Sequence, residues 1–114
     1  MSRDPETLVD MAEACKLISQ FIGDMDQAMF TSDLKTQSAV LHQLLVVGEA
    51  TKRLSEPFRN LHTGIPWKLM GGIRNHLIHA YDMVDLDEVW NTATKDIPSL
   101  LMEIEPLLPK PNEV

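Results

Sequence analysis

Residues 40–49 read Val-Leu-His-Gln-Leu-Leu-Val-Val-Gly-Glu, a stretch that is apolar over much of the circumference of a helix. A helix of this kind is expected where neighbours pack against several of its sides. Helical periodicity continues on both sides of the stretch, and the alternation typical of strands is almost absent. We therefore expect a long helix from about Ser32 to about Leu54, inside an all-α antiparallel four-helix bundle.

The flanking segments provide the other three helices of this bundle. The first is expected over about residues 4–22, with Asp4 as its N-cap. The third should begin near Pro66, and the fourth at Asp85, which forms a pattern resembling a capping box with Glu88. Two irregularities are expected as well: a short extra helix in the 55–65 connection, and a kink where Pro98 interrupts the fourth helix.

Length and composition limit the class of protein. A chain of 114 residues can build one hydrophobic core but not two, so residues 1–114 are expected to form a single domain. The one cysteine, Cys15, cannot form an internal disulfide and lies in an apolar helical series, so we expect it in the core. No signal peptide and no apolar run of about 20 residues is visible. We expect a soluble, cytoplasmic protein that does not enter the membrane.

The charge is unevenly distributed along the chain. The net charge is −7, but the segment from Ala50 to Tyr81 has five cations and one acid, a local charge of +4, which leaves −11 for the remainder. A basic island in an acidic body can concentrate an anionic ligand at one place. Clustering by chance remains the alternative. If the ligand is RNA, the expected binding residues are Lys52, Arg53 and Lys68.

The basic island ends in residues 74–81, which read Arg-Asn-His-Leu-Ile-His-Ala-Tyr. Arginine stays charged and forks onto phosphate oxygens, and histidine is suited to moving protons near neutral pH. These are the minimal parts for cutting a phosphodiester without a metal. The catalytic candidates are therefore Arg74 and His79, while His76 is expected at the edge of the core and is the weaker candidate.

We expect the third helix to carry the octapeptide, and its geometry then sorts these side chains. The core would receive Met70, Ile73, Leu77, Ala80 and Val84. Asn75 and His79, four residues apart, would share a face, and Arg74 would align with Tyr81. Two further expectations concern approach to this segment: a notch at Gly71 and Gly72 for another backbone, a helix or a phosphate, and an exposed Ile78 that would contact a partner chain.

Other kinds of site are not supported by the pattern. The two histidines of the octapeptide have no carboxylate four residues away on the expected helix, because Asp82 and Asp85 lie beyond its end. We therefore expect no metal site. The chain has no phosphate-binding glycine loop, Cys15 has no partner for nucleophilic work, and no cofactor is expected.

The string Arg74-x4-His79-x-Tyr81 resembles the signature of the HEPN superfamily, and specifically of HepT-type ribonuclease toxins. The likeness extends to segments 47–54, 66–75 and 84–90, and it covers about residues 4–106. It implies a metal-independent endoribonuclease of a toxin–antitoxin system, in which Arg74 and His79 are catalytic and Asn75 supports them. It also implies a homodimer with a shared cleft, and an MntA-like nucleotidyltransferase antitoxin that adds AMP to Tyr81.

RNA chemistry agrees with this resemblance, because RNA carries its own nucleophile, the 2′-OH. His79 would then move protons, and Arg74 would stabilise charge on the scissile phosphate. Two alternatives remain open. One is a non-catalytic HEPN module that binds RNA or nucleotide beside a nucleotidyltransferase. The other is a helical interaction protein with an accidental motif. The sequence assigns no role to Glu49.

Overall fold

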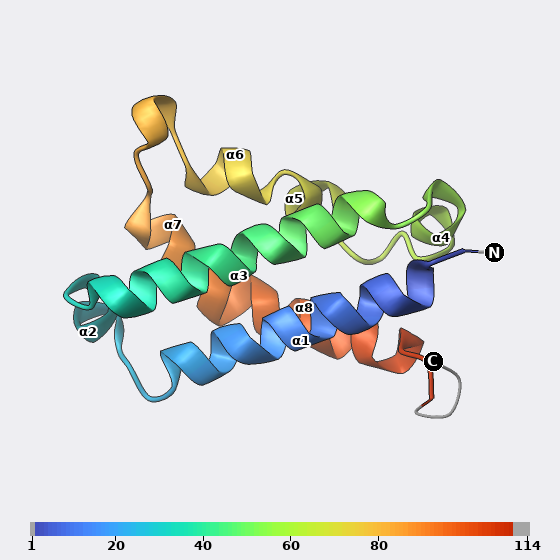
Figure 1. The fold of residues 1–114 in the computed structure, drawn as a ribbon, viewed down its shortest axis with the longest axis horizontal. Coiled ribbons are helices and arrows are strands. Elements are labelled where there is room, and N and C mark those ends of the chain that lie inside the picture. Colours follow the sequence, from blue (N-terminus) through green and yellow to red (C-terminus); the bar gives the residue numbers. More distant parts are fainter. Residues whose placement is uncertain (1, 111–114) are drawn as a thin grey trace.

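The computed structural model describes residues 2–110, and these contain helices but no β-strands (Figure 1). The α-helices are α1 (Asp4–Ile22), α2 (Gln27–Thr31), α3 (Leu34–Arg53), α4 (Glu56–Leu61), α5 (Trp67–Gly71), α6 (Ile73–Leu77), α7 (Leu86–Asn91) and α8 (Ile97–Ile104). The 3-10 turns η1 (Ala80–Asp82) and η3 (Glu105–Leu107) and the π-helical segment η2 (Thr92–Asp96) complete the set. The all-α prediction is confirmed.

The chain runs up and down four times along one axis (Figure 1). Helix α1 and helix α3 are antiparallel neighbours, α5 and α6 follow one another back along α3, and α7 continues through η2 into α8, which packs against α1. This is the antiparallel four-helix bundle expected from the sequence. The short helix α4 lies in the 55–65 connection, as predicted.

Helix α3 is the central element of the bundle. It contacts α1, α5, α6 and α7, and its buried positions include Val40, Leu44, Val47 and Ala50. The expectation drawn from residues 40–49 is therefore confirmed. Helix α1 contributes Cys15 to the same core, as predicted, and burial raises the pKa of this thiol to about 12.

A close approach between α3 and the α5–α6 pair occurs at Gly48. A Cβ atom on Gly48 would lie only 2.6 Å from Cγ2 of Ile73 and 3.2 Å from the carbonyl oxygen of Met70. A Cβ on Gly71 would meet nothing closer than Thr51 Cγ2 at 3.8 Å, an ordinary contact. The close helix contact is thus at Gly48 on α3, whereas at Gly71, where a notch was expected, α3 makes only ordinary contacts. Gly72 instead separates α5 from α6.

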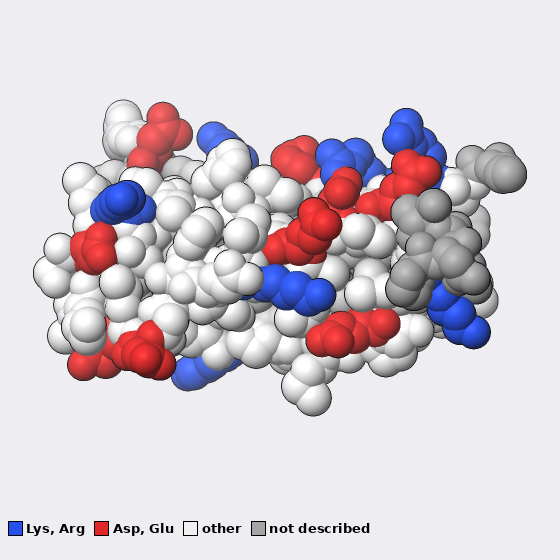
Figure 2. All heavy atoms as spheres, turned by 60° about the horizontal axis from the view of Figure 1, so that its bottom comes forward, with Lys and Arg blue, Asp and Glu red and all other residues white. Residues whose placement is uncertain are grey.

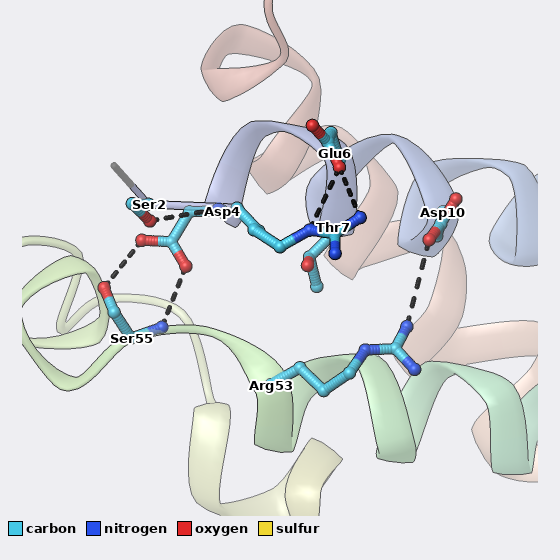
Figure 3. A pocket seen from close by; sticks show the side chains of 8 residues that line it. Ser2, Asp4, Glu6, Thr7, Asp10, Arg53 and Ser55 are labelled. Atoms are coloured by element: carbon cyan, nitrogen blue, oxygen red, sulfur yellow. Dashed lines mark hydrogen bonds and ion pairs between the residues drawn. The ribbon is translucent and has the colours of Figure 1, made fainter.

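The beginning of α1 differs from the prediction in the role of Asp4. Asp4 is the first helical residue rather than the N-cap, and its carboxylate accepts bonds from the Ser55 amide at 2.9 Å and the Ser55 hydroxyl at 2.6 Å (Figure 3). The carboxylate is therefore engaged by the turn between α3 and α4. Burial acts to raise the pKa of Asp4, but hydrogen bonds from Ser55 and Ser2 outweigh it and lower the pKa.

The fourth arm of the bundle starts where the sequence indicated. Asp85 is the N-cap of α7, and its Oδ1 accepts a bond from the Glu88 amide at 3.2 Å. The interruption near Pro98 takes the form of the π-helical segment η2, which directly precedes α8. Pro98 lies in the first turn of α8. Proline has no N–H to donate to the carbonyl four residues earlier, which favours such a local change in helix type. Within residues 2–110, no helix is long and apolar enough to span a membrane.

Candidate functional site

The octapeptide 74–81 does not lie on one helix. Helix α6 ends at Leu77, after which Ile78 (φ −119°, ψ 118°) and His79 (φ −97°, ψ −170°) are extended. The His79 amide donates to the Met83 carbonyl at 2.8 Å, and Ile78 forms an antiparallel bridge with Val84. The predicted continuous helix was therefore wrong. The backbone groups of the segment find partners across a hairpin instead of one turn back along a helix.

This hairpin changes the side-chain groups expected from helical geometry. Met70, Ile73 and Leu77 are buried as predicted, but Ala80 and Val84 are exposed. Ile78 is half-buried and packs against the core, so its predicted exposure to a partner chain was also wrong. The grouping of Arg74 with Tyr81, and of Asn75 with His79, loses its basis because only the first member of each pair lies on α6.

The tip of the hairpin presents Tyr81 to solvent. Tyr81 and Asp82 have positive φ angles of 63° and 57°, and the Met83 amide bonds to the Ala80 carbonyl at 3.4 Å. Two central residues with positive φ are the mark of a type I′ hairpin turn, a conformation that is unfavourable for a bulky residue such as tyrosine. The Tyr81 side chain is 97% exposed, and the turn projects from the bundle (Figure 1).

Arg74 and Asn75 are exposed on the short helix α6. Neither side chain forms a hydrogen bond or ion pair with another residue in the described part of the chain. Asn75 and His79, which would share a face on a continuous helix, are therefore not joined by a hydrogen bond. An arginine without an acidic neighbour keeps its full charge and all of its donors for an anion, which makes Arg74 the group best suited to hold a phosphate.

Two carboxylates at the start of α7 face the two histidines of the octapeptide. Nε2 of His79 lies 3.9 Å from Oδ2 of Asp85, and Nε2 of His76 lies 2.8 Å from Oε2 of Glu88. The second pair explains why Glu88 does not complete the capping box: its side chain bonds to α6. His76 is exposed rather than at the core edge, although it is tied to α7.

Sequence reasoning missed these two pairs because it placed Asp85 beyond the end of the third helix and Glu88 in a capping box on the fourth. One signal was available in the sequence. The two histidines are three residues apart, and so are the two acids. If the chain reverses direction between them, the inner histidine meets the inner acid and the outer histidine meets the outer acid. Across residues 2–110, no group of three or more His, Cys, Asp and Glu side chains is arranged to hold a metal ion.

The structure separates the three cations expected to contact RNA. Lys52 lies 3.5 Å from Glu49, and its stem passes near Gly71 at the α5–α6 side of α3. Arg53 instead turns to α1, where it lies 3.8 Å from Asp10. Lys68, on α5, has no ion pair within the described range and is exposed. Lys52 therefore lies on the α5–α6 side of α3, Lys68 lines a hollow together with residues of α4, and Arg53 belongs to another face.

A polar hollow of about 630 Å³ lies beside Arg53, between α1 and the turn after α3 (Figure 3). Its charged groups already have partners: Arg3 bonds to Glu6 at 3.0 Å, Asp4 accepts bonds from Ser55, and Arg53 lies near Asp10. This hollow joins the ends of two helices and is separate from the octapeptide, none of whose residues line it.

Comparison with known proteins identifies the family of the chain. A family model described as "Ribonuclease HepT-like" matches residues 11–107. The chain belongs to this HepT-like family. A protein named "Probable ribonuclease HepT" from Thermococcus cleftensis is 44% identical over 100 residues, which are 88% of this chain and 91% of the relative.

Other relatives are also similar over most of their length. A candidate RNase of Methanocaldococcus jannaschii is 39% identical, with 89% of this chain and 84% of the relative covered. A candidate RNase of Caldanaerobacter subterraneus is 31% identical, with 90% and 92% covered. No solved structure matches the chain. The names of the relatives indicate that ribonuclease activity is a property of the family.

Proposed function

We propose that this HepT-like chain is an endoribonuclease that cleaves RNA without a metal, through attack of the ribose 2′-OH. The observation that carries the proposal is the exposed pair of Arg74, which has no acidic partner within residues 2–110, and His79, which is fixed by its backbone and accessible at 57%. A cation that holds phosphate and a histidine that moves protons are the groups this reaction requires.

In the proposed reaction, His79 accepts the proton of the 2′-OH as the 2′ oxygen bonds to phosphorus. The bond from phosphorus to the 5′ oxygen breaks, and the leaving oxygen takes a proton from solvent or from a second His79 across a dimer cleft. Arg74 stabilises the negative charge that grows on the phosphate oxygens, and Asn75 contacts the same phosphate. The products are a 2′,3′-cyclic phosphate and a 5′-hydroxyl.

Replacement of single histidines tests this proposal. His79→Ala should lower RNA cleavage by about 10²- to 10⁴-fold, the usual contribution of a general acid or base. His76→Ala is the matched control, because it removes a histidine that is engaged by Glu88, and it should retain most of the activity. Equal cleavage by wild type and His79→Ala would overturn the catalytic assignment. RNA binding without cleavage by wild type would favour a non-catalytic HEPN module.

The proposed biological role is the toxin of a toxin–antitoxin pair, silenced by an MntA-like nucleotidyltransferase that transfers AMP from ATP to Tyr81. The hydroxyl of Tyr81 would bond to the α-phosphorus as pyrophosphate leaves. Support comes from the hairpin tip, which exposes the whole ring at a point that an enzyme can reach. The added phosphate would place bulk and negative charge two residues from His79.

Mass analysis after co-expression with the antitoxin tests the regulation. Wild-type protein should gain the mass of AMP, and Tyr81→Phe should not gain it. An unchanged mass, or an addition that survives Tyr81→Phe, would contradict the proposal. The homodimer is tested separately by light scattering at working concentration, where a strict monomer would argue against a shared cleft.

A further inference from the structure

Asp85 connects three parts of the site. Its amide donates to the Leu77 carbonyl at 2.9 Å and so closes the hairpin. Its Oδ1 accepts a bond from the Glu88 amide and so begins α7. This leaves Oδ2 to face Nε2 of His79 at 3.9 Å. The carboxylate is thus held by its own backbone and by the cap, and its second oxygen has a fixed direction.

The imidazole of His79 has no other side-chain or backbone partner within residues 2–110. Its backbone is fixed by the bond to Met83. Orientation of the ring therefore depends on Asp85. Asp82, although closer in sequence, lies in the positive-φ turn and forms no bond to His79. A carboxylate that faces one ring nitrogen favours a proton on that nitrogen and leaves the other nitrogen as the acceptor.

We propose that Asp85 is the positioning residue of His79, which holds Nε2–H toward the carboxylate and turns Nδ1 to the substrate. This inference rests on the proposed ribonuclease function. The proton of the 2′-OH then passes to Nδ1, and Oδ2 of Asp85 stabilises the imidazolium that forms. The separation of 3.9 Å shortens to a hydrogen bond as RNA closes the site, since catalytic hydrogen bonds are often long before substrate binds.

The substitution Asp85→Asn separates this role from the structural role of the cap. Asparagine is as good an N-cap as aspartate, so its oxygen can still accept the Glu88 amide. Its NH2 group then faces Nε2 of His79, and two donors cannot share a hydrogen bond. Nε2 must become the acceptor, which moves the ring proton to Nδ1 and removes the base from the substrate.

Steady-state kinetics give the first test. Asp85→Asn should lower kcat by at least about 10-fold, the loss expected when the partner that orients a working histidine is replaced. KM and Tm should change little. Asp85→Ser, which retains a cap but cannot reach the ring, should lower kcat in the same way. The matched control is Asp33→Asn, at the N-cap of α3, where Oδ1 accepts the Thr36 amide at 3.0 Å. It should leave kcat unchanged.

Nitrogen NMR of His79 gives a second test that does not depend on turnover. Neutral His79 should be the Nε2–H form in the wild type and the Nδ1–H form in Asp85→Asn. If wild type cleaves RNA and Asp85→Asn retains its kcat, or if the ring form is the same in both, the role of Asp85 is wrong while the ribonuclease remains. If wild type cleaves no RNA, the proposed function fails and the positioning role fails with it.

Discussion

Asp4 connects the start of α1 to the turn after α3 through two bonds from Ser55. Because these bonds favour the ionised carboxylate, its pKa is lower in the folded protein than in the unfolded chain. The resulting stabilisation is fully present above the unfolded pKa of about 4, and it is lost as the pH falls through the lower folded pKa.

We therefore expect Asp4→Asn to lower the free energy of unfolding by about 1 kcal/mol at pH 7, the net value of a typical hydrogen bond. The difference from wild type should shrink as the pH falls below about 4. Urea unfolding at several pH values measures both. Asp10→Asn is the control, because Asp10 is more than half exposed and 3.8 Å from Arg53, so its loss should have little effect. A constant difference down to pH 2 would contradict the assignment.

Exposure of the candidate catalytic residues was easier to predict than their contacts. Arg74 and His79 stand out in sequence because a cation and a histidine five residues apart suit phosphodiester chemistry, and both are exposed. The partner of His79 depends on a chain reversal that brings α7 back to α6. Asp85 is six residues from His79 in sequence, and no helical rule connects them. The contact became visible only with the hairpin.

At the scale of elements, α1 and α3 were predictable because their apolar periodicity is long enough to average out single exceptions. The third arm of the bundle, which consists of α5, α6 and the hairpin after them, could not be predicted in the same way. Ala80 and Val84 continue the period of Met70, Ile73 and Leu77, yet both are exposed. The break after Leu77 is decided by backbone bonds across the hairpin, which no local pattern reports.

The backbone of the turn at the tip of the hairpin is strained, and this strain can be tested by substitution. Tyr81 has a φ of 63°, where glycine is favoured and a non-glycine residue is strained by about 1 kcal/mol. Tyr81→Gly should relieve this strain and slow hydrogen exchange of the His79 amide, which bonds across the hairpin. Tyr81→Phe retains the strain and should exchange like wild type. Faster exchange in Tyr81→Gly would show that the tyrosine does not strain the turn.

The contact between α3 and the α5–α6 pair gives a second prediction for an element. Gly48→Ala places a methyl group 2.6 Å from Cγ2 of Ile73, so the helices must separate. We expect a loss of about 1–3 kcal/mol in the free energy of unfolding, the usual cost of overpacking a core. Gly71→Ala is the matched control, because its methyl group would make only ordinary contacts. Equal stability of the two variants would contradict the close approach.

At the scale of the whole molecule, the cations of the basic island either form one continuous surface or are neighbours only in the sequence. Ion pairs occupy Lys52 and Arg53, whereas Arg59, Lys68 and Arg74 have none among residues 2–110. Arg59 and Lys68 line one hollow of about 740 Å³, and Nε of Arg59 is buried without a hydrogen-bond partner. On the face shown in Figure 2, cations are instead interspersed with acids.

The salt dependence of RNA binding shows whether a local basic surface or the net charge of the protein controls the affinity for RNA. In a His79→Ala background, which prevents cleavage, Lys68→Gln should weaken binding and reduce the slope of log K against log salt by about one. Lys16→Gln changes the net charge equally but lies on α1, outside the island, and should leave the slope unchanged. Because the two variants have the same total charge, any difference between them is caused by position. Equal effects would mean that RNA responds to the whole acidic molecule and that the island forms no binding surface.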